Sequence, residues 1–516
     1  MVGAGILSSR VLGLVRTRLF AHYFATSAVA DAFGAAFKIP NFLQNLFGEG
    51  VLSASFIPVY ARLVAEGDKE AAQRVAGAVL ALLALLTAVL VLAGVALTRP
   101  LIGLVAPGFA GEKKELTILL VQILFPGTGL LVLSAWCLGI LNSHRRFLVS
   151  YAAPVVWNLA IIGALLWYGG STAQARLAEV TAWASVLGSA LQVGVQLPEV
   201  FRVLGALRVN LDLSSSHVRT VLRSFGPVFV GRGVVQISAF IDTTLASLLG
   251  NGPVAALSYA QALYVLPVSL FGMSVSAAEL PAMSSALGSE REVASYLRTR
   301  LDAGIRQIAF YVVPSAAVFV ALGDVAAGAL YQTGNFTRSQ SVYVWAILAG
   351  SGVGLLASTM GRLYASTYYA LRDTRTPLRY GIVRVVLTIV LGYLCALPLP
   401  RALGIPIHWG AAGLTASAGI AGWIEFLLLR RTLNARIGPT GLDVALTLRL
   451  WGAAAVGAAL GWGVKLCLPP LHPVIAAVLI LGAFGVAYLG IADLMAVPQA
   501  RQLTSRLRRR GSRQLP

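Results

Sequence analysis

Long apolar stretches, each sufficient to cross a bilayer as a helix, follow one another from the start of the chain almost to its end. A spanning helix needs about 20 mostly apolar residues, and short polar segments separate these stretches. The pattern predicts an all-α polytopic membrane protein with fourteen transmembrane helices. The predicted spans are 4–25, 28–61, 73–98, 116–141, 148–169, 178–200, 220–249, 253–286, 305–331, 341–370, 380–399, 409–429, 449–468 and 472–493.

The second and eighth spans are too long and too polar for simple helices, so we expect both to be bent. The second contains PNFLQNLFGEG at 40–50, where Pro40, Gly48 and Gly50 permit a bend. A polar, broken helix at membrane depth is tolerated where it lines a cavity or packs against protein. We expect cavity lining, and helix packing through small and amide residues is the alternative. The polar side chains concerned are Asn41, Gln44, Asn45 and Glu49.

Two pairs of segments reveal an internal repeat. LFGEGVLSASFIP at 46–58 resembles LFGMSVSAAELP at 270–281, and LGILNSHRRFLVSYAAPV at 138–155 parallels STYYALRDTRTPLRYGIV at 366–383. The helix count between the pairs makes the repeat parallel, an architecture of transporters that bind substrate between the halves. The predicted parts are an N-lobe at 1–200, a basic cytoplasmic linker at 201–219, a C-lobe at 220–436, two further helices within 437–495 and a basic tail at 496–516.

Composition and charge agree with this interpretation. The 516 residues are 57% hydrophobic and only 12% charged, about half the charge of a typical soluble domain. The net charge is +20, and most arginines fall in alternate loops and in the tail. The positive-inside rule makes those segments cytoplasmic, with both termini inside. This distribution explains the positive charge through topology and lipid headgroups, without nucleic acid.

Several kinds of chemistry lack the residues they need. Cys137, Cys395 and Cys467 form no CxxC pair, and the histidines form no HExxH motif, so we expect no cofactor and no metal. No predicted loop exceeds about twenty residues, which leaves no room for the extramembrane domain of a glycosyltransferase. We therefore expect a protein that is not an enzyme.

Ionisable residues within the spans are costly and become functional candidates by default. They are Arg10, Arg16, Arg18, Asp31, Lys38, Glu49, Arg232, Asp242, Glu279, Arg362 and Glu425.

Three motifs carry a resemblance to the MurJ/MviN family. SRVLGLVRTRLF at 9–20 and ADAFGAAFKIPNFLQNLFGEGVLSASFIPVY at 30–60 resemble its signature, and YALRDTRTP at 369–377 agrees with it. The resemblance implies the MOP-superfamily fold, similar to MATE transporters, with two six-helix lobes and two C-terminal helices that form a groove for a lipid tail. It also implies a monomer in the bacterial cytoplasmic membrane that flips lipid II, a pyrophosphate-linked peptidoglycan precursor, beside the cell-wall synthesis machinery.

The resemblance assigns substrate binding or gating to several of the charged residues. Guanidinium donates two parallel hydrogen bonds to phosphate oxygens, so cavity arginines suit a pyrophosphate. Snorkelling to the interface is the alternative for Arg10. Asp31 is expected to pair with Arg16 or Lys38, either in a gate or as a structural ion pair. The positions that match the family are Arg10, Arg16, Asp31, Lys38, Glu49 and Arg362.

The chain departs from the family at two positions. Relatives carry arginine where this sequence has Gln44 and Ala262. Arg232 is a candidate to replace the missing charge. Asp242 is a candidate for coupling to a cation or proton, with a structural hydrogen bond as the alternative.

Other functions remain open at this stage. An oligosaccharide-lipid flippase or a drug/cation antiporter would share the fold, although the arginines disfavour a drug antiporter. A membrane scaffold that has lost transport is a further alternative, because two family arginines are absent.

Overall fold

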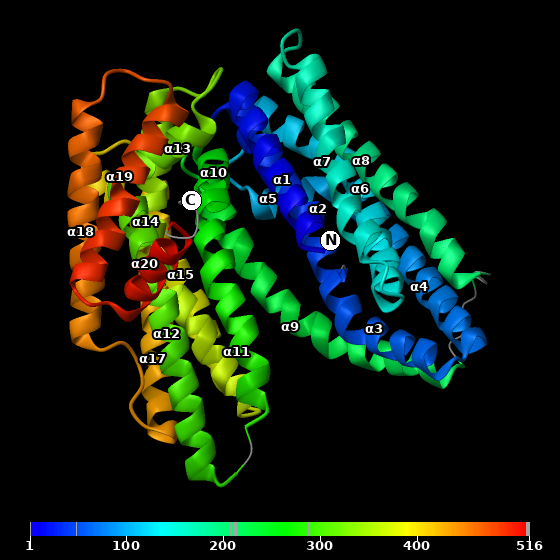
Figure 1. The fold of residues 1–516 in the computed structure, drawn as a ribbon. Coiled ribbons are helices and arrows are strands. Elements are labelled where there is room, and N and C mark those ends of the chain that lie inside the picture. The colour runs from blue at the N-terminus through cyan, green and yellow to red at the C-terminus, as the bar shows by residue number, and fades with distance from the viewer. Residues whose placement is uncertain (1, 48, 206–208, 210–213, 287, 512–516) are drawn as a thin grey trace. The chain divides into compact units, whose positions relative to one another are not determined.

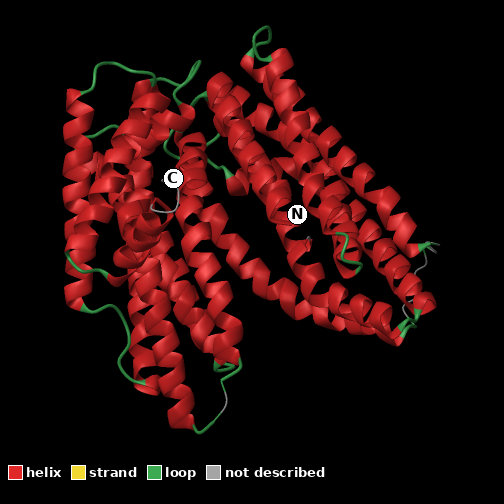
Figure 2. Cartoon of the chain, viewed as in Figure 1, coloured by secondary structure: helices red, strands yellow, loops and turns green. Residues whose placement is uncertain are grey.

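The computed structural model describes the chain apart from residues 1, 48, 206–208, 210–213, 287 and 512–516. The described residues form helices joined by short loops, with no strand among them (Figure 2). By their internal packing they form two compact units, Met1–Ala255 and Ala256–Pro516. Since the long described segments are helical, their backbone hydrogen bonds are made mainly within each segment, as a bilayer requires.

The first unit contains ten helical elements, counting the start of α10 (Figure 1). They are α1 (Val2–Phe24), α2 (Ala28–Phe47), α3 (Glu49–Glu66), α4 (Lys69–Ala96), α5 (Thr98–Val105), α6 (Gly111–Ser143), α7 (Phe147–Tyr168), α8 (Gln174–Leu204), α9 (Ser216–Ser247) and α10 (Pro253–Pro267).

The second unit holds the rest of α10 and the C-terminal elements. They are the π-helix η1 (Val268–Met273), α11 (Ser274–Ser284), α12 (Glu290–Ala321), α13 (Gly323–Tyr331), α14 (Arg338–Ala370), α15 (Arg375–Ala396), α16 (Pro398–Ala402), the 3₁₀ helix η2 (Ile407–Trp409), α17 (Gly410–Ile437), α18 (Val444–Cys467), α19 (Pro473–Leu494) and α20 (Pro498–Gly511).

Eleven helical segments among the described residues are long and apolar enough to cross a membrane. The predicted all-helical membrane fold is therefore confirmed, whereas the exact number of fourteen spans stays a prediction. The predicted spans outside the eleven are 4–25, 28–61 and 220–249, which form α1, α2 with α3, and α9. These helices carry most of the candidate charges, and parts of them lie outside the described residues.

Both predicted interruptions fall within the expected spans. The second span is divided into α2 and α3, and α3 takes a different direction from α2 (Figure 1). Pro40 is buried inside α2 and does not end this helix. The eighth span is interrupted by the π-helix η1, a local distortion that often marks functional positions.

The repeat is visible in the lengths of the elements. α6 and α14 each contain 33 residues, and α7 and α15 each contain 22. The turns that follow α6 and α14 place Arg145 and Arg372 at φ of 59° and 58°, an uncommon conformation for residues with a side chain. The two halves therefore share local geometry as well as sequence.

The repeat and the packing divide the chain differently at α9. The repeat predicts α9 as the first helix of the C-lobe, and the packing groups it with the first unit. Residues 201–204 of the predicted linker form the last turn of α8 and residues 216–219 the first turn of α9, while 206–208 and 210–213 lie outside the described residues. The lobe boundaries drawn from the repeat remain a prediction.

Helix packing in the second unit relies on one very close crossing. A Cβ atom at Gly354 of α14 would lie 2.3 Å from the Cα atom of Gly419 in α17. Small residues at such crossings let backbones approach within a membrane, where van der Waals contact replaces the hydrophobic effect. α14 and α17 are thereby held in direct backbone contact.

Asp373 holds the start of α15 and supports a prediction about acid stability. Its carboxylate accepts hydrogen bonds from the backbone N–H and hydroxyl of Thr376 at 3.0 and 2.7 Å and from Arg436 at 2.7 Å. These bonds lower the pKa of Asp373 to about 2, from an ordinary value of 3.8. The contribution of Asp373 to the free energy of unfolding should be complete above its ordinary pKa of 3.8 and should be lost as the pH falls through about 2.

We predict that Asp373→Asn lowers the thermal unfolding midpoint near neutral pH, by an amount equivalent to about 1 kcal/mol. The difference from wild type should shrink as the medium is acidified. Asp443→Asn is the matched control, because Asp443 precedes α18 without a capping side-chain bond to any described residue. Equal effects of the two substitutions at every pH would contradict the assignment.

Candidate functional site

Arg16 lies on α1 against the aromatic face of Trp157 in α7. The guanidinium carbon is 4.6 Å from the centroid of the Trp157 ring, a distance typical of a cation–π contact. The ring is itself fixed, because its Nε1–H donates to the Ser185 carbonyl at 3.1 Å and its other neighbour is the Phe37 ring at 6.0 Å. Arg16 is thus held on a rigid aromatic support.

One nitrogen of this guanidinium lacks an acceptor among the described residues. Nη1 of Arg16 is buried, and no side chain or carbonyl of the described chain accepts its hydrogen bonds. A buried donor without a partner costs about 1–3 kcal/mol, and more when it is charged. Positioned donors of this kind are suited to an anionic ligand.

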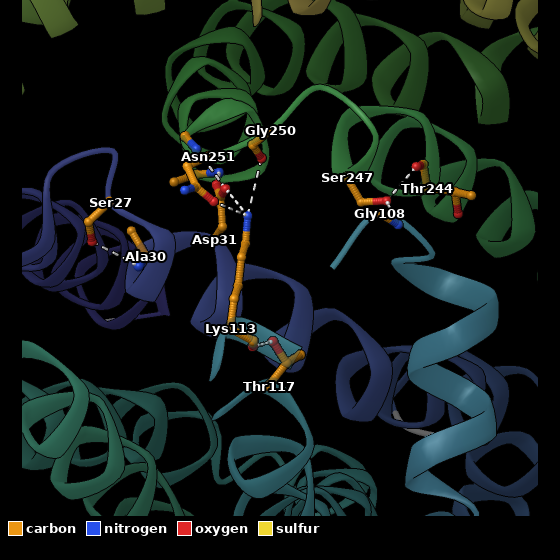
Figure 3. A network of polar contacts seen from close by, with 12 residues as sticks. Ser27, Ala30, Asp31, Gly108, Lys113, Thr117, Thr244, Ser247, Gly250 and Asn251 are labelled. Carbon is orange, nitrogen blue, oxygen red and sulfur yellow. Dashed lines mark hydrogen bonds and ion pairs between the residues drawn. The ribbon is translucent and has the colours of Figure 1, made fainter. Parts of the chain in front are cut away.

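Asp31 of α2 lies at the centre of a second polar cluster, shown in Figure 3. Its side chain is fully buried, and Oδ2 accepts a hydrogen bond from Nζ of Lys113 at 2.7 Å. The Lys113 ammonium also donates to the Gly250 carbonyl at 3.2 Å and to Oδ1 of Asn251 at 3.1 Å. The cluster joins α2, α6 and the loop between α9 and α10.

The same carboxylate caps the first turn of α10. Oδ2 of Asp31 accepts the Gly252 N–H at 2.7 Å, and Oδ1 accepts the Ala255 N–H at 2.8 Å. The first N–H groups of a helix have no partner inside the helix, and the helix dipole favours negative charge there. Asp31 therefore acts as an N-cap supplied by a distant helix.

The predicted pairing of Asp31 with Arg16 or Lys38 was wrong, because Asp31 pairs with Lys113. Arg16 is held on Trp157. Lys38 lies about 10 Å from Asp31 along α2, two turns away on the same face. Neither cation forms an ion pair with Asp31 in the described part of the chain.

Lys38 contacts α9 instead. Its ammonium donates a hydrogen bond to Oγ1 of Thr243 and interacts electrostatically with the neighbouring carboxylate of Asp242. One turn further along α2, the Phe42 ring meets the Phe240 ring edge-on at 5.3 Å. Successive contacts along one face of α2 therefore meet positions that run backward along α9, so the two helices are antiparallel neighbours.

The structure leaves several predicted site residues untested as binding groups. Glu49 lies in α3 and Arg232 in α9, but their side chains fall outside the described residues. The others described are Arg10, exposed on α1; Arg362, exposed on α14; and Asn41, Gln44 and Asn45 of α2, which are half-buried or exposed.

Sequence reasoning missed Lys113 and Trp157. Lys113 lies in the predicted loop before the span 116–141, and Trp157 lies within the predicted span 148–169. Their partners lie 82 and about 140 residues away in the sequence. No local pattern connects such pairs, although a tryptophan in the middle of a predicted span was a weak signal.

The Asp31–Lys113 pair generates a stability prediction. Lys113→Met should lower the thermal unfolding midpoint strongly, because removing one partner of a buried pair costs about 3–5 kcal/mol. Lys113→Met combined with Asp31→Asn should cost less than the sum of the single changes, as expected for coupled residues.

The matched control is Arg99→Met, which removes a cation from the Arg99–Glu115 pair at the surface. Those side chains are 69% and 56% exposed, so the loss should stay below about 1 kcal/mol. If both lysine and arginine changes lower the midpoint equally, the cluster does not hold α2 to the start of α10.

Comparison of the sequence with known proteins identifies a matching family. Residues 20–482 match the family described as lipid II flippase MurJ. The chain is 30% identical over 460 residues to the "Probable lipid II flippase MurJ" of Rhizobium meliloti (strain 1021), covering 87% of this chain and 82% of the relative. It is 31% identical over 437 residues to the "Lipid II flippase MurJ" of Burkholderia cenocepacia, covering 83% and 82%.

Solved structures agree on the fold. A structure titled "Lipid II flippase MurJ, inward closed conformation" superposes with a TM-score of 0.79 at 22% identity, over 96% of this chain and 98% of that chain. An inward-facing multidrug MATE transporter of the MOP superfamily gives a TM-score of 0.67 at 18% identity, over 83% and 95%. With a family match over most of its length and relatives of this similarity, the chain belongs to the lipid II flippase MurJ family.

Proposed function

We propose that this protein flips lipid II from the inner to the outer leaflet of the bacterial cytoplasmic membrane by alternating access. The observation that carries the proposal is the buried Nη1 of Arg16, a guanidinium donor without an acceptor among the described residues. Family membership supports lipid II as the substrate, and Arg16 supplies the chemistry that its pyrophosphate needs.

Arg16 is prepared for a phosphate ligand in two respects. Trp157 holds the guanidinium by its face at 4.6 Å, which leaves the edge with its N–H groups available for oxygen acceptors. The buried surroundings exclude water, so each charge-assisted hydrogen bond is stronger than it would be at the surface. A pyrophosphate oxygen would satisfy the donor that the protein leaves without an acceptor.

The Asp31 cluster is proposed as a gate on the outer side. It joins the start of α2 to the start of α10, and the predicted topology places this end of both helices outside. Opening toward the outer leaflet would require the three hydrogen bonds to the Asp31 carboxylate to exchange for water or other donors. The residues proposed for this gate are Asp31, Lys113, Asn251 and Gly252.

Transport of this kind needs no covalent step, so the protein acts as a transporter and not as an enzyme. The anionic headgroup crosses within the protein, and the polyprenyl tail stays in lipid along α18 and α19. We propose that it works as a monomer with both termini in the cytoplasm, beside the machinery that consumes lipid II.

The alternatives are less well supported. The similarity to a MATE transporter concerns the fold alone, at 18% identity. A drug/cation antiporter has no evident use for a buried guanidinium donor. The family arginines absent at Gln44 and Ala262 leave Arg16 with a larger share of the pyrophosphate charge, and replacement by Arg232 stays a prediction.

We predict that Arg16→Ala abolishes lipid II translocation while membrane abundance stays normal. Complementation of a strain depleted of its own flippase measures this directly. Arg16→Lys should restore only part of the activity, because an ammonium cannot donate the two parallel bonds of guanidinium.

Two controls sharpen this experiment. Arg176→Ala removes an arginine whose side chain is 69% exposed and should complement like wild type. Trp157→Phe keeps an aromatic face under Arg16 and should retain more activity than Trp157→Ala. Normal complementation by Arg16→Ala would exclude Arg16 as the pyrophosphate ligand.

The proposed topology is tested by labelling single cysteines from outside the cell. After Cys137 and Cys395 are replaced, the native Cys467 at the exposed end of α18 should react with an impermeant reagent. A cysteine at Ser171 should also react, whereas one at Ser214 should react only in permeabilised cells. External labelling at Ser214 would overturn the assignment of both termini to the cytoplasm.

A further inference from the structure

We propose that Phe37 of α2 is a positioning residue for Arg16, so that the affinity of the guanidinium for a pyrophosphate depends on the position of α2. The inference rests on the proposed function and adds a way in which the affinity of the Arg16 site changes during transport. It is carried by four aromatic side chains of the first compact unit, called here the aromatic cluster: Phe20, Phe33, Phe37 and Trp157.

The four rings form a continuous set of contacts across three helices. The ring centroid of Phe20 in α1 lies 4.9 Å from that of Phe33 in α2. Phe33 and Phe37, one turn apart on α2, stack with their centroids 6.0 Å apart and an interplanar angle of 15°. The Phe37 ring in turn stacks with Trp157 of α7, at 6.0 Å and 30°. These separations fall within the range at which aromatic pairs attract one another.

Arg16 closes this set of contacts. Its guanidinium carbon lies 4.6 Å from the centroid of the Trp157 ring, and Phe20 follows Arg16 by one turn of α1. Residues one turn apart project from the same face of a helix, so this face of α1 meets both α2 and α7. The position of the guanidinium is therefore set by α2, through Phe37 and Trp157, as well as by its own helix.

The other neighbours of Trp157 hold only one edge of its indole. Nε1–H donates to the Ser185 carbonyl at 3.1 Å, and a Cβ atom at Gly188 would lie 3.0 Å from the adjacent Cδ1. Both contacts come from α8 and touch the five-membered ring, which leaves the plane of the indole to be fixed by another group. The stacked ring of Phe37 is the contact that fixes this plane.

The plane of the indole matters because a cation is attracted to the face of an aromatic ring and not to its edge. If α2 shifts, the Phe37 ring leaves Trp157 and the face under Arg16 is no longer held. A guanidinium donates two parallel hydrogen bonds to phosphate oxygens only in one orientation, so its affinity for pyrophosphate falls. α2 also carries Asp31 of the proposed outer gate. Opening of that gate and release of the pyrophosphate would then occur together.

The test measures binding of a polyprenyl pyrophosphate to the purified full-length protein in detergent, with the matching polyprenol as the reference for the tail. Wild type should bind the pyrophosphate more tightly than the polyprenol. Phe37→Leu removes the ring but keeps an apolar side chain, and it should lower the affinity for the pyrophosphate about three- to tenfold. Its affinity for the polyprenol should stay unchanged, because the uncharged probe does not engage the guanidinium.

Matched variants separate positioning from packing. Phe37→Tyr keeps the ring and should bind the pyrophosphate like wild type. Phe42→Leu removes a ring further along α2 that contacts Phe240 of α9 and lies outside the aromatic cluster, so it should also bind like wild type. Phe37→Met takes the place of Phe37→Leu if the leucine variant does not fold, because methionine adapts its shape to an irregular space.

A double-variant cycle tests whether Phe37 acts through Arg16. In the Arg16→Ala background the pyrophosphate and the polyprenol should bind alike, and adding Phe37→Leu should change neither affinity. A ring that only packs helices together would lower the affinity for the pyrophosphate by the same factor in both backgrounds.

The inference is overturned if Phe37→Leu binds the pyrophosphate as tightly as Phe42→Leu does, or if Phe37→Leu has the same effect with and without Arg16. The two proposals fail in different ways. A full preference for the pyrophosphate in Arg16→Ala contradicts Arg16 as the ligand, and the role of Phe37 falls with it. Loss of that preference in Arg16→Ala, together with unchanged binding by Phe37→Leu, removes only the role of Phe37.

Discussion

The contact between the Asp31 carboxylate and the first turn of α10 is the interaction on which the arrangement of α2, α6 and the start of α10 depends. Three donors converge on it, from Lys113, Gly252 and Ala255, and none is close to it in sequence. A buried carboxylate is tolerable only when its oxygens are satisfied in this way. The contact also lies where the chain leaves the first compact unit, since Ala255 is the last residue of that unit. A conformational change that separates α2 from α10 must therefore break this contact.

The same helix carries the other two features of the site. Lys38 lies two turns below Asp31 and faces Thr243 and Asp242. Phe37, beside it in the chain, stacks near the Trp157 ring that supports Arg16. α2 thus links a capped helix start, a lysine–threonine hydrogen bond to α9 and a guanidinium support. Its small residues bring it close to its neighbours, because Ala32, Ala35 and Ala36 are completely buried.

Hydropathy and repeats predicted the class of fold well, because bilayer thickness fixes helix length and duplication fixes helix order. They also identified the α2 segment and its charges as unusual. The partners of those charges could not be predicted, since Asp31 meets Lys113 and Lys38 meets Thr243 only after helices far apart in sequence have packed. The lobe to which α9 belongs stays a prediction, because duplication records the origin of a helix whereas packing decides its neighbours.

The Gly354–Gly419 crossing has a mechanical consequence for the second unit. At this crossing the two backbones are in direct contact, so no side chain between them can change rotamer and let α14 slide past α17. The two helices therefore move as one rigid pair. Deformation within that unit is then left to other elements. The π-helix at Val268–Met273 is one of them, because its hydrogen bonds join residues five apart and depart from the regular α-helical pattern. Gly354 and Gly419 thus make the α14–α17 pair rigid, and the flexibility of the unit lies in other elements such as η1.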